Sequence, residues 1–298
     1  MSNPVAVSFE FFPPSDEAGA AQLWAALGRL APLRPRFVSV TCGADGSTRD
    51  RTQACVLRIL RDTDLTVAPH LTCVGSSREQ VRALAHEYWR HGVRHLLALR
   101  GDAPSGRRSA PSDVTADAGF AYAADLVAGL KSTAHFEISV AAYPEGHPET
   151  GTVEADLENL KRKIDAGAGR AITQFFFDND RYLRYRDRCA ASGIRASIVP
   201  GILPIVRFSQ LARFAGRCGA CLPEWLRRRF EGLDDDAETH RLIAAHVAIE
   251  QVQYLRRHGV EEFHFYTLNR AELTYAVCHA LGLKAIAPAR ASLGECAA

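Results

Sequence analysis

Short apolar runs recur eight times along the chain, and longer amphipathic segments lie between them. Short apolar runs of this kind are typical of buried strands, and the amphipathic segments are typical of helices. The predicted strands span residues 5–10, 37–42, 66–73, 95–100, 136–143, 171–176, 196–203 and 262–268. The predicted helices span residues 16–31, 48–62, 77–91, 117–131, 152–167, 179–192, 207–216, 236–258 and 270–282.

The regular alternation of strand and helix predicts an α/β fold with a parallel sheet and right-handed crossovers. Eight such units favour closure into a (β/α)8 TIM barrel. The alternative is a doubly wound open sheet, which in nucleotide-binding proteins has a glycine-rich turn after its first strand. Here the first strand runs into Phe11-Phe12-Pro13-Pro14 instead, so we expect the barrel.

We expect residues 1–298 to form a single catalytic barrel domain with extra helical segments. Residues 217–235 interrupt the regular repeat and are interpreted as an additional helical turn and a loop. Residues 103–116 are rich in Pro, Ser and Gly and are interpreted as an inserted loop. Residues 285–298 are rich in small residues and are expected to form a flexible tail.

Composition narrows the classes of protein further. The formal net charge of +2 gives no reason to expect nucleic acid as a partner. No stretch of 18 apolar residues and no signal-peptide pattern is present, so we expect no membrane and a cytoplasmic location. Among the eight cysteines only Cys218 and Cys221 have a C-x-x-C spacing, without a second ligand pair. We therefore expect no metal, and reduced cysteines that act as small buried hydrophobes.

The first strand carries one acid, Glu10, among phenylalanines. Alternation along the strand places Val5, Val7, Phe9 and Phe11 on one face and Ala6, Ser8, Glu10 and Phe12 on the other. A carboxyl group against aromatic walls has a raised pKa and can donate a proton near neutral pH. We expect this of Glu10, although a strand-end acid that simply reaches water has the same pattern.

Polar residues also lie at the ends of the other predicted strands. In barrels the catalytic residues gather at the C-terminal ends of the strands. These ends carry Glu10, Thr41, His70, Arg100, Asp102, Tyr143, His147, Gln174, Asn269 and Arg270. In the predicted helix 152–167, Asp156, Asn159 and Lys163 share one face, which is either solvated or binds the phosphates and ribose of a long cofactor.

Six motifs then suggest a family. They are residues 8–14 (Ser-Phe-Glu-Phe-Phe-Pro-Pro), 99–102 (Leu-Arg-Gly-Asp), 143–149 (Tyr-Pro-Glu-Gly-His-Pro-Glu), 172–178 (Ile-Thr-Gln-Phe-Phe-Phe-Asp), 200–204 (Pro-Gly-Ile-Leu-Pro) and 265–270 (Phe-Tyr-Thr-Leu-Asn-Arg). Together they closely resemble the motifs of bacterial methylenetetrahydrofolate reductases, in order and over nearly the whole chain.

The resemblance implies a flavoprotein that binds FAD on a (β/α)8 barrel without a Rossmann motif. Such enzymes reduce 5,10-methylenetetrahydrofolate to 5-methyltetrahydrofolate for methionine synthesis. NADH or NADPH reduces the flavin and leaves before the folate binds, in a ping-pong cycle. The resemblance also leads us to expect a homo-oligomer.

The resemblance further implies roles for single residues. Glu10 resembles the general acid, and Asp102 a carboxylate that contacts the pterin and lies near the flavin. Gln174 resembles an amide that contacts folate and nicotinamide, and Gln210 and Arg270 resemble folate contacts. The positions that resemble FAD contacts are Thr41, Cys42, Ala44, His70, Arg100, Gly101, Asp102, Tyr122, Ala123, Tyr143, His147, Asp156, Asn159 and Lys163. Ala168 falls at a helix end that supports the flavin site in the family.

Two departures and two alternatives stand beside this interpretation. Cys42 occupies a position where the family often has Tyr, and the 103–116 loop is long enough to act as a lid or to alter the nicotinamide preference. The alternatives are another FAD-dependent barrel oxidoreductase, such as a proline dehydrogenase, and a non-catalytic barrel that binds folate or flavin. Gln174 and Arg270 argue against the first, and the acid Glu10 argues against the second.

Overall fold

The computed structural model describes residues 5–43, 48–74, 76–101, 119–147, 150 and 152–286. Within these ranges the strand segments form one parallel sheet, in the order β7-β6-β5-β4-β3-β2-β1-β9-β8. The segments are β1 (Ala6–Phe11), β2 (Val38–Val40), β3 (Val67–Thr72), β4 (His95–Leu99), β5 (Glu137–Ala142), β6 (Arg170–Thr173), β7 (Ser197–Val199), β8 (Gly201–Ile202) and β9 (Glu262–Tyr266). The eight predicted strands are therefore present, most of them shorter than predicted.

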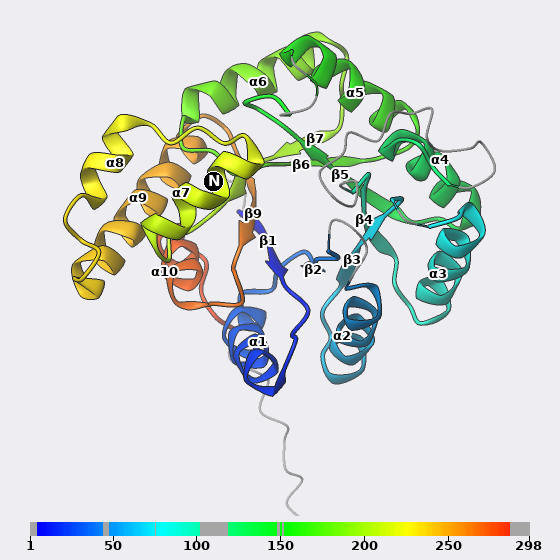
Figure 1. The fold of residues 1–298 in the computed structure, drawn as a ribbon, viewed down its shortest axis with the longest axis horizontal. Helices are drawn as coiled ribbons and strands as arrows, with labels where there is room; N and C mark the ends of the chain where they lie inside the picture. The colour runs from blue at the N-terminus through cyan, green and yellow to red at the C-terminus, as the bar shows by residue number, and fades with distance from the viewer. Residues whose placement is uncertain are drawn as a thin grey trace, which may run out of the picture.

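The sheet closes into a barrel through the predicted strand 196–203, which is divided at Pro200. Proline has no backbone N–H and interrupts a strand ladder. The half before it, β7, pairs with β6, and the half after it, β8, pairs with β9. The carbonyl of Pro200 still accepts a hydrogen bond from the N–H of His264 at 3.0 Å. Figure 1 shows the resulting ring of strands surrounded by helices, which confirms the TIM-like barrel and excludes the open sheet.

Helices follow the strands as the amphipathic segments predicted. They are α1 (Glu17–Leu30), α2 (Arg49–Asp62), α3 (Arg78–Arg90), α4 (Ala123–Thr133), α5 (Val153–Asp165), α6 (Asn179–Ala191), α7 (Phe208–Cys218), α8 (Glu224–Phe230), α9 (Ala237–Arg257) and α10 (Glu272–Ala280). Helix α8 is the additional helical segment expected within residues 217–235. None of the described helices is long and apolar enough to cross a membrane.

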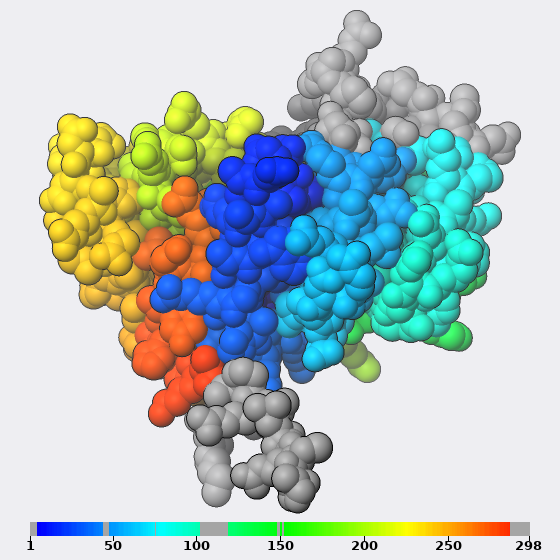
Figure 2. All heavy atoms as spheres, turned by 90° about the horizontal axis from the view of Figure 1, so that it is seen from below, coloured from blue at the N-terminus to red at the C-terminus, as the bar shows by residue number. Residues whose placement is uncertain are grey.

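The main core lies between the strands and the surrounding helices. Val7, Phe9 and Phe11 are at most 2% exposed and belong to it, as the alternation in the first strand predicted. The two ends of the described chain meet in this layer, where β1 pairs with β9. Figure 2 shows the N-terminal segments, in blue, beside the C-terminal ones, in orange. Because this pairing closes the barrel, it places Glu10 of β1 beside Tyr266 of β9.

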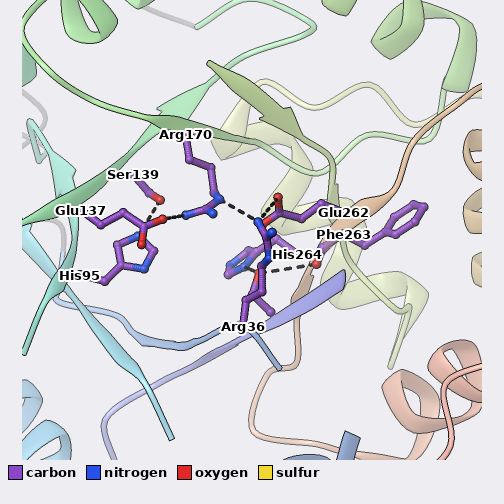
Figure 3. A network of polar contacts seen from close by, with 9 residues as sticks. Arg36, His95, Glu137, Ser139, Arg170, Glu262, Phe263 and His264 are labelled. Atoms are coloured by element: carbon purple, nitrogen blue, oxygen red, sulfur yellow. Dashed lines mark hydrogen bonds and ion pairs between the residues drawn. The ribbon is translucent and has the colours of Figure 1, made fainter. Parts of the chain in front are cut away.

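A polar network occupies the N-terminal end of the barrel, opposite the end that carries the predicted site (Figure 3). Arg170, at the start of β6, forms ion pairs with Glu137 and, at 3.0 Å, with Glu262. Arg36 contacts the second carboxylate oxygen of Glu262 at 3.1 Å. These charges are paired with one another, which is the condition under which buried charges are tolerated.

Some predicted features lie outside the described residues. They are the 103–116 loop, the part of the 285–298 tail from residue 287 onward, and the site residues Ala44 and Asp102.

Candidate active site

A large cavity lies at the C-terminal ends of the strands, where barrel enzymes carry their chemistry. Its volume is about 820 Å³, and it extends from β3 across β4 and β5 to β6. We call it the large cavity. The predicted site residues that line it are Cys42, Arg100, Gly101, Tyr122, Ala123, Tyr143, His147, Asp156, Asn159, Lys163 and Gln174. Residues far apart in the sequence thus come together at one end of the barrel.

Glu10 lies on β1 between two histidines from other strands. Its Oε2 atom is 3.2 Å from Nε2 of His70 on β3 and 3.6 Å from Nε2 of His264 on β9. The second ring nitrogen of His264 is 2.8 Å from the hydroxyl of Ser8, the neighbouring inward-facing residue of β1. The carboxylate of Glu10 is only 12% exposed. Two imidazoles therefore contact one oxygen of a nearly buried carboxylate.

This geometry corrects the predicted pKa of Glu10. Burial raises that pKa, as expected, but the electrostatic effect of His70 and the contacts with His264 and His70 outweigh burial. The net effect lowers the pKa of Glu10 from 4.5 to about 2. Phe9 and Phe11 do not form the predicted aromatic surroundings of Glu10, because they belong to the core on the opposite face of the strand. Glu10 is thus an ionised carboxylate in the protein without substrate.

The polar stripe on α5 faces the large cavity. Asp156 is 6% exposed, and its Oδ2 atom accepts a hydrogen bond from the backbone N–H of His147 at 2.5 Å. Lys163 is half-buried and donates from Nζ to the carbonyl of Ala141 at 2.5 Å. Burial lowers the pKa of Lys163 to about 8, although Asp156 acts in the opposite direction. Asp156 and Lys163 are therefore not on a solvated helix face, although Asn159 is exposed, and no carboxylate of the described residues lies within ion-pair distance of Lys163.

Aromatic and amide groups complete the large cavity. The rings of Tyr143 and His147 meet edge to face with their centres 4.6 Å apart. Gln174 follows β6 and is half-buried, and its Oε1 accepts a hydrogen bond from the backbone N–H of Phe175 at 3.0 Å. Its amide nitrogen can therefore donate to a ligand while the oxygen is held.

A second pocket of about 640 Å³ lies beside the large cavity, and Arg217 lines both. We call it the arginine pocket. Its residues come from the loop after β1 (Phe12), from the loop between β8 and α7 and from α7 itself, and from the loop after β9 (Leu268). The predicted folate contact Gln210 lines this pocket.

Glu10 lies near the C-terminal end of β1, at the rim that the strand ends form, and it lines neither cavity itself. Phe12, two residues beyond Glu10, lines the arginine pocket, and Thr72, two residues beyond His70, lines the large cavity.

Besides Glu10 and His70, three further predicted site residues among the described ones line neither cavity. Thr41 follows β2, and its backbone N–H donates to the carbonyl of Phe11 at 2.9 Å. Ala168 is 4% exposed and lies three residues after the end of α5. Arg270 is exposed at the same rim, two residues after Leu268. These positions support the rim or extend it, but they do not form the walls of a cavity.

Sequence reasoning missed several residues of the site. His264 was available from the alternation in residues 262–268, which places Glu262, His264 and Tyr266 on one face of β9. Arg217 and Cys218 line the large cavity, but they are the last two residues of α7, beyond the predicted helix 207–216, in a segment for which the strand-end rule has no prediction. Tyr185 reaches the cavity from α6, and no sequence signal pointed to it.

The cysteines only partly follow expectation. Cys55, Cys73, Cys189 and Cys278 are buried, as predicted. The C-x-x-C pair is not, since Cys218 is half-buried and Cys221 is exposed. None of the seven cysteines in the described ranges forms a disulfide. The pair lies at the end of α7 and in the loop after it, which leaves Cys221 in solvent.

Fold and site together define a parallel α/β-barrel enzyme with an extended cavity at the C-terminal ends of its strands. A family model described as methylenetetrahydrofolate reductase matches residues 2–282. The chain belongs to this family, and its function is that of a methylenetetrahydrofolate reductase.

Individual relatives agree with this assignment. The 5,10-methylenetetrahydrofolate reductase of Salmonella typhimurium is 52% identical over 284 residues, which cover 95% of this chain and 93% of that protein. The corresponding protein of Pectobacterium carotovorum is 53% identical, covering 95% and 92%. Methylenetetrahydrofolate reductase (NADH) 1 of Arabidopsis thaliana is 36% identical, covering 93% of this chain but 48% of the plant protein.

A solved structure from Clostridium thermocellum, described as binding two copies of 5-methyl-5,6,7,8-tetrahydrofolic acid, has a similar fold. Its TM-score is 0.61 at 12% identity, and the match covers 94% of this chain and 95% of that chain. At this identity the similarity supports the barrel fold alone.

Proposed function

We propose that the chain reduces 5,10-methylenetetrahydrofolate to 5-methyltetrahydrofolate with electrons from NADH or NADPH, using FAD held in the large cavity. The observation that carries this proposal is the large cavity of about 820 Å³ with a partly buried cation, Lys163, on its wall. A cation with a pKa lowered by burial is expected where an anionic ligand compensates for the lost solvation. The residues present therefore fit a cofactor with a diphosphate.

The groups of the large cavity match the parts of FAD. Lys163 and Arg100 suit the diphosphate, because charge-assisted hydrogen bonds to phosphate oxygens are strong. Asp156 and Asn159 suit ribose hydroxyls, and Tyr143 and His147 offer rings against flat groups. FAD, when bound, supplies the hydride transfer, and the protein supplies binding and orientation.

Glu10 is proposed to deliver the proton that opens the five-membered ring of the substrate to a reactive iminium. The carboxylate is ionised in the free protein, so it must first receive a proton. A folate that covers the rim excludes water and favours the neutral carboxyl group. His70 and His264 are the nearest proton sources, at 3.2 and 3.6 Å from Oε2. The other oxygen, Oε1, is then the one proposed to face N10 of the folate.

The remaining groups are proposed to orient the folate. Gln174 can donate its amide hydrogens to the pterin or, in the other half-reaction, to the nicotinamide. Gln210 and Arg270 suit the amide and the carboxylate of the glutamyl end. A site shared by two successive ligands is consistent with a ping-pong cycle.

Purification tests the cofactor directly. The protein is expected to be yellow, and chromatography of the released flavin is expected to identify FAD. A colourless protein that does not take up added FAD would contradict the proposal. Stopped-flow reduction of the bound flavin with NADH and NADPH in separate experiments then identifies the electron donor, and light scattering tests the proposed homo-oligomer.

A further inference from the structure

The barrel interior contains two buried serine–histidine pairs with the same separation. Oγ of Ser8 on β1 is 2.8 Å from Nδ1 of His264 on β9, and the two residues lie opposite each other in the parallel ladder. Oγ of Ser139 on β5 is 2.8 Å from Nε2 of His95 on β4. All four residues are at most 2% exposed. The first pair has a further contact, because the other ring nitrogen of His264, Nε2, is 3.6 Å from Oε2 of Glu10.

The hydroxyl of Ser8 determines which ring nitrogen of His264 keeps its hydrogen. The carbonyl oxygen of Phe263, which can only accept, is 3.5 Å from Oγ of Ser8. A hydroxyl group has one hydrogen, so when Ser8 donates it to this carbonyl its oxygen accepts from Nδ1–H of His264. The partner of one ring nitrogen sets the tautomer of an imidazole. Nε2 is therefore the nitrogen that gains and loses a proton toward Glu10.

Few titratable groups surround this contact. His70 on β3 reaches the same carboxylate oxygen at 3.2 Å. The rings of Phe37 and Tyr266 pack against His264 with their centres 5.8 and 5.4 Å away, and burial raises the pKa of Tyr266 well above its usual value, so both rings are uncharged. Burial lowers the pKa of His95 to about 4, so His95 is neutral near pH 7. Among the described residues, the groups whose positive charge can face the carboxylate are therefore His70 and His264.

Of these two histidines, His264 is held more firmly toward Glu10. Its Nδ1 is anchored by Ser8, and the residue is 0% exposed. Among the described residues, no hydrogen-bond partner holds the other ring nitrogen of His70, and Thr72, two residues further along β3, lines the large cavity. His264 therefore keeps one orientation toward Glu10, whereas His70 lies on the side of the proposed cofactor.

We infer that His264 supplies the proton that Glu10 delivers to the folate, and that Ser8 positions His264 for this transfer. The inference rests on the proposed role of Glu10. While Glu10 is ionised, His264 carries a hydrogen on both ring nitrogens. When the folate covers the rim, the Nε2–H bond breaks and an O–H bond forms at Oε2 of Glu10. The imidazole that remains is neutral and still donates from Nδ1 to Ser8.

The remaining steps return the pair to its starting state. Rotation of the carboxyl group of Glu10 turns the O–H toward N10 of the folate, which takes the proton as its bond to the bridging carbon breaks. After the product leaves, the carboxylate takes a proton from solvent and returns it to Nε2 of His264. Nδ1 keeps its hydrogen throughout. Without Ser8 the imidazole can carry its single hydrogen on Nε2, in a neutral form that contacts the carboxylate but has no proton to give.

Ser8→Ala tests the positioning role. Stopped flow measures the folate half-reaction, the reoxidation of the reduced holoenzyme by 5,10-methylenetetrahydrofolate, over a range of pH. We expect a rate about tenfold below that of the wild type, the effect of about one lost hydrogen bond. The decline of this rate at alkaline pH should begin about 0.5–1 pH unit lower, because the cationic imidazole has lost an acceptor. Reduction of the flavin by NADH or NADPH should keep its wild-type rate.

Ser139→Ala is the matched control, because it removes a serine hydroxyl at the same distance of 2.8 Å from a buried histidine. Urea unfolding should show a similar loss of stability in the two alanine variants. Ser139→Ala should nevertheless keep the wild-type rate and pH dependence of the folate half-reaction.

His264→Gln tests the proton source itself. Its amide can still donate a hydrogen bond to Glu10 but has no proton to transfer. The folate half-reaction should therefore fall by about 100-fold or more, while reduction of the flavin by the nicotinamide should remain largely intact.

The outcomes separate this inference from the proposed function. A wild-type rate and pH dependence of the folate half-reaction in Ser8→Ala overturns the inference, and so does an equal effect of Ser139→Ala. If Ser8→Ala does not fold, His264→Gln decides, and a folate half-reaction slowed no more than flavin reduction overturns the inference. In these cases the wild-type enzyme still reduces the folate, and the proposed function stands. If the wild-type holoenzyme is not reoxidised by the folate, the proposed function fails and the inference fails with it.

Discussion

At the scale of single residues, the environment of Glu10 differs most from what the sequence predicts. Its neighbours along the chain are phenylalanines, and they suggested an apolar pocket. In space its neighbours are His70 and His264, from strands β3 and β9. Alternation predicts which face of a strand a residue occupies, but it does not predict which side chains of other strands lie opposite. Barrel closure brought the histidines to Glu10, and this is why the position was predictable and the pKa was not.

Replacing Glu10 by Gln tests its role as proton donor. Glu10→Gln preserves the size of the side chain but removes its acidic proton, so folate reduction should fall by about 100-fold to 10,000-fold. Reduction of the flavin by the nicotinamide needs no proton from Glu10 and should remain largely intact. Stopped-flow measurement of the two half-reactions checks this, with the exposed Glu224→Gln as control. Equal loss of both half-reactions would contradict the assigned role.

Lys163 gives a prediction about pH. Its pKa in the free protein is lowered to about 8, whereas a bound diphosphate favours the charged form and raises that pKa. FAD binding should therefore take up a proton near pH 8, and affinity should weaken as the pH rises through 8. Titration calorimetry of the flavin-free protein in buffers of different ionisation enthalpy measures the uptake. In Lys163→Met the uptake should vanish and the affinity should fall, whereas proton uptake unchanged from the wild type would exclude Lys163 as its source.

At the scale of elements, the strand that is divided at Pro200 closes the barrel, because β7 pairs with β6 and β8 pairs with β9. The N–H of Gly201 donates to the hydroxyl of Thr173 at 3.0 Å, and the hydroxyl of Tyr266 donates to the carbonyl of Thr173 at 2.7 Å. Sequence periodicity predicted one strand here, and the order of elements was correct. Periodicity cannot reveal that a backbone must approach a tyrosine ring of another strand, because that approach depends on the closed barrel.

Gly201 should not tolerate a side chain. A β-carbon at this position would overlap the carbonyl oxygen of Thr173 and lie 2.5 Å from Cε2 of Tyr266. Gly201→Ala should lower the free energy of unfolding by about 2–4 kcal/mol, as overpacking and strain do. Urea unfolding measures the change. The control is Gly28→Ala in α1, where a β-carbon meets nothing within 4 Å and where alanine should stabilise the helix by up to about 1 kcal/mol. Similar stability of the two variants would refute the close approach.

At the scale of the whole molecule, the two ends of the barrel have different roles. Predicted site residues gather at the C-terminal ends, around the two cavities, and the sequence predicted this well because the strand-end rule depends only on strand order. The N-terminal end instead carries the paired charges of Arg36, Glu137, Arg170 and Glu262 (Figure 3). These residues stand at or near strand starts, where no catalytic role was predicted.

The paired charges should therefore affect stability and not chemistry. Arg170 and Glu262 are only 10% and 14% exposed, so Arg170→Met leaves two carboxylates without their shared partner. Removing one member of a buried ion pair costs about 3–5 kcal/mol, and urea unfolding should record a loss of this order. The double variant Arg170→Met/Glu262→Gln should recover part of it, because the buried carboxylate that lost one of its two arginine partners is then gone. If the two ends of the barrel act independently, kcat per folded, flavin-loaded molecule stays at the wild-type value in both variants. A fall in kcat without loss of stability would mean that the charges at the N-terminal end act on the site through the barrel.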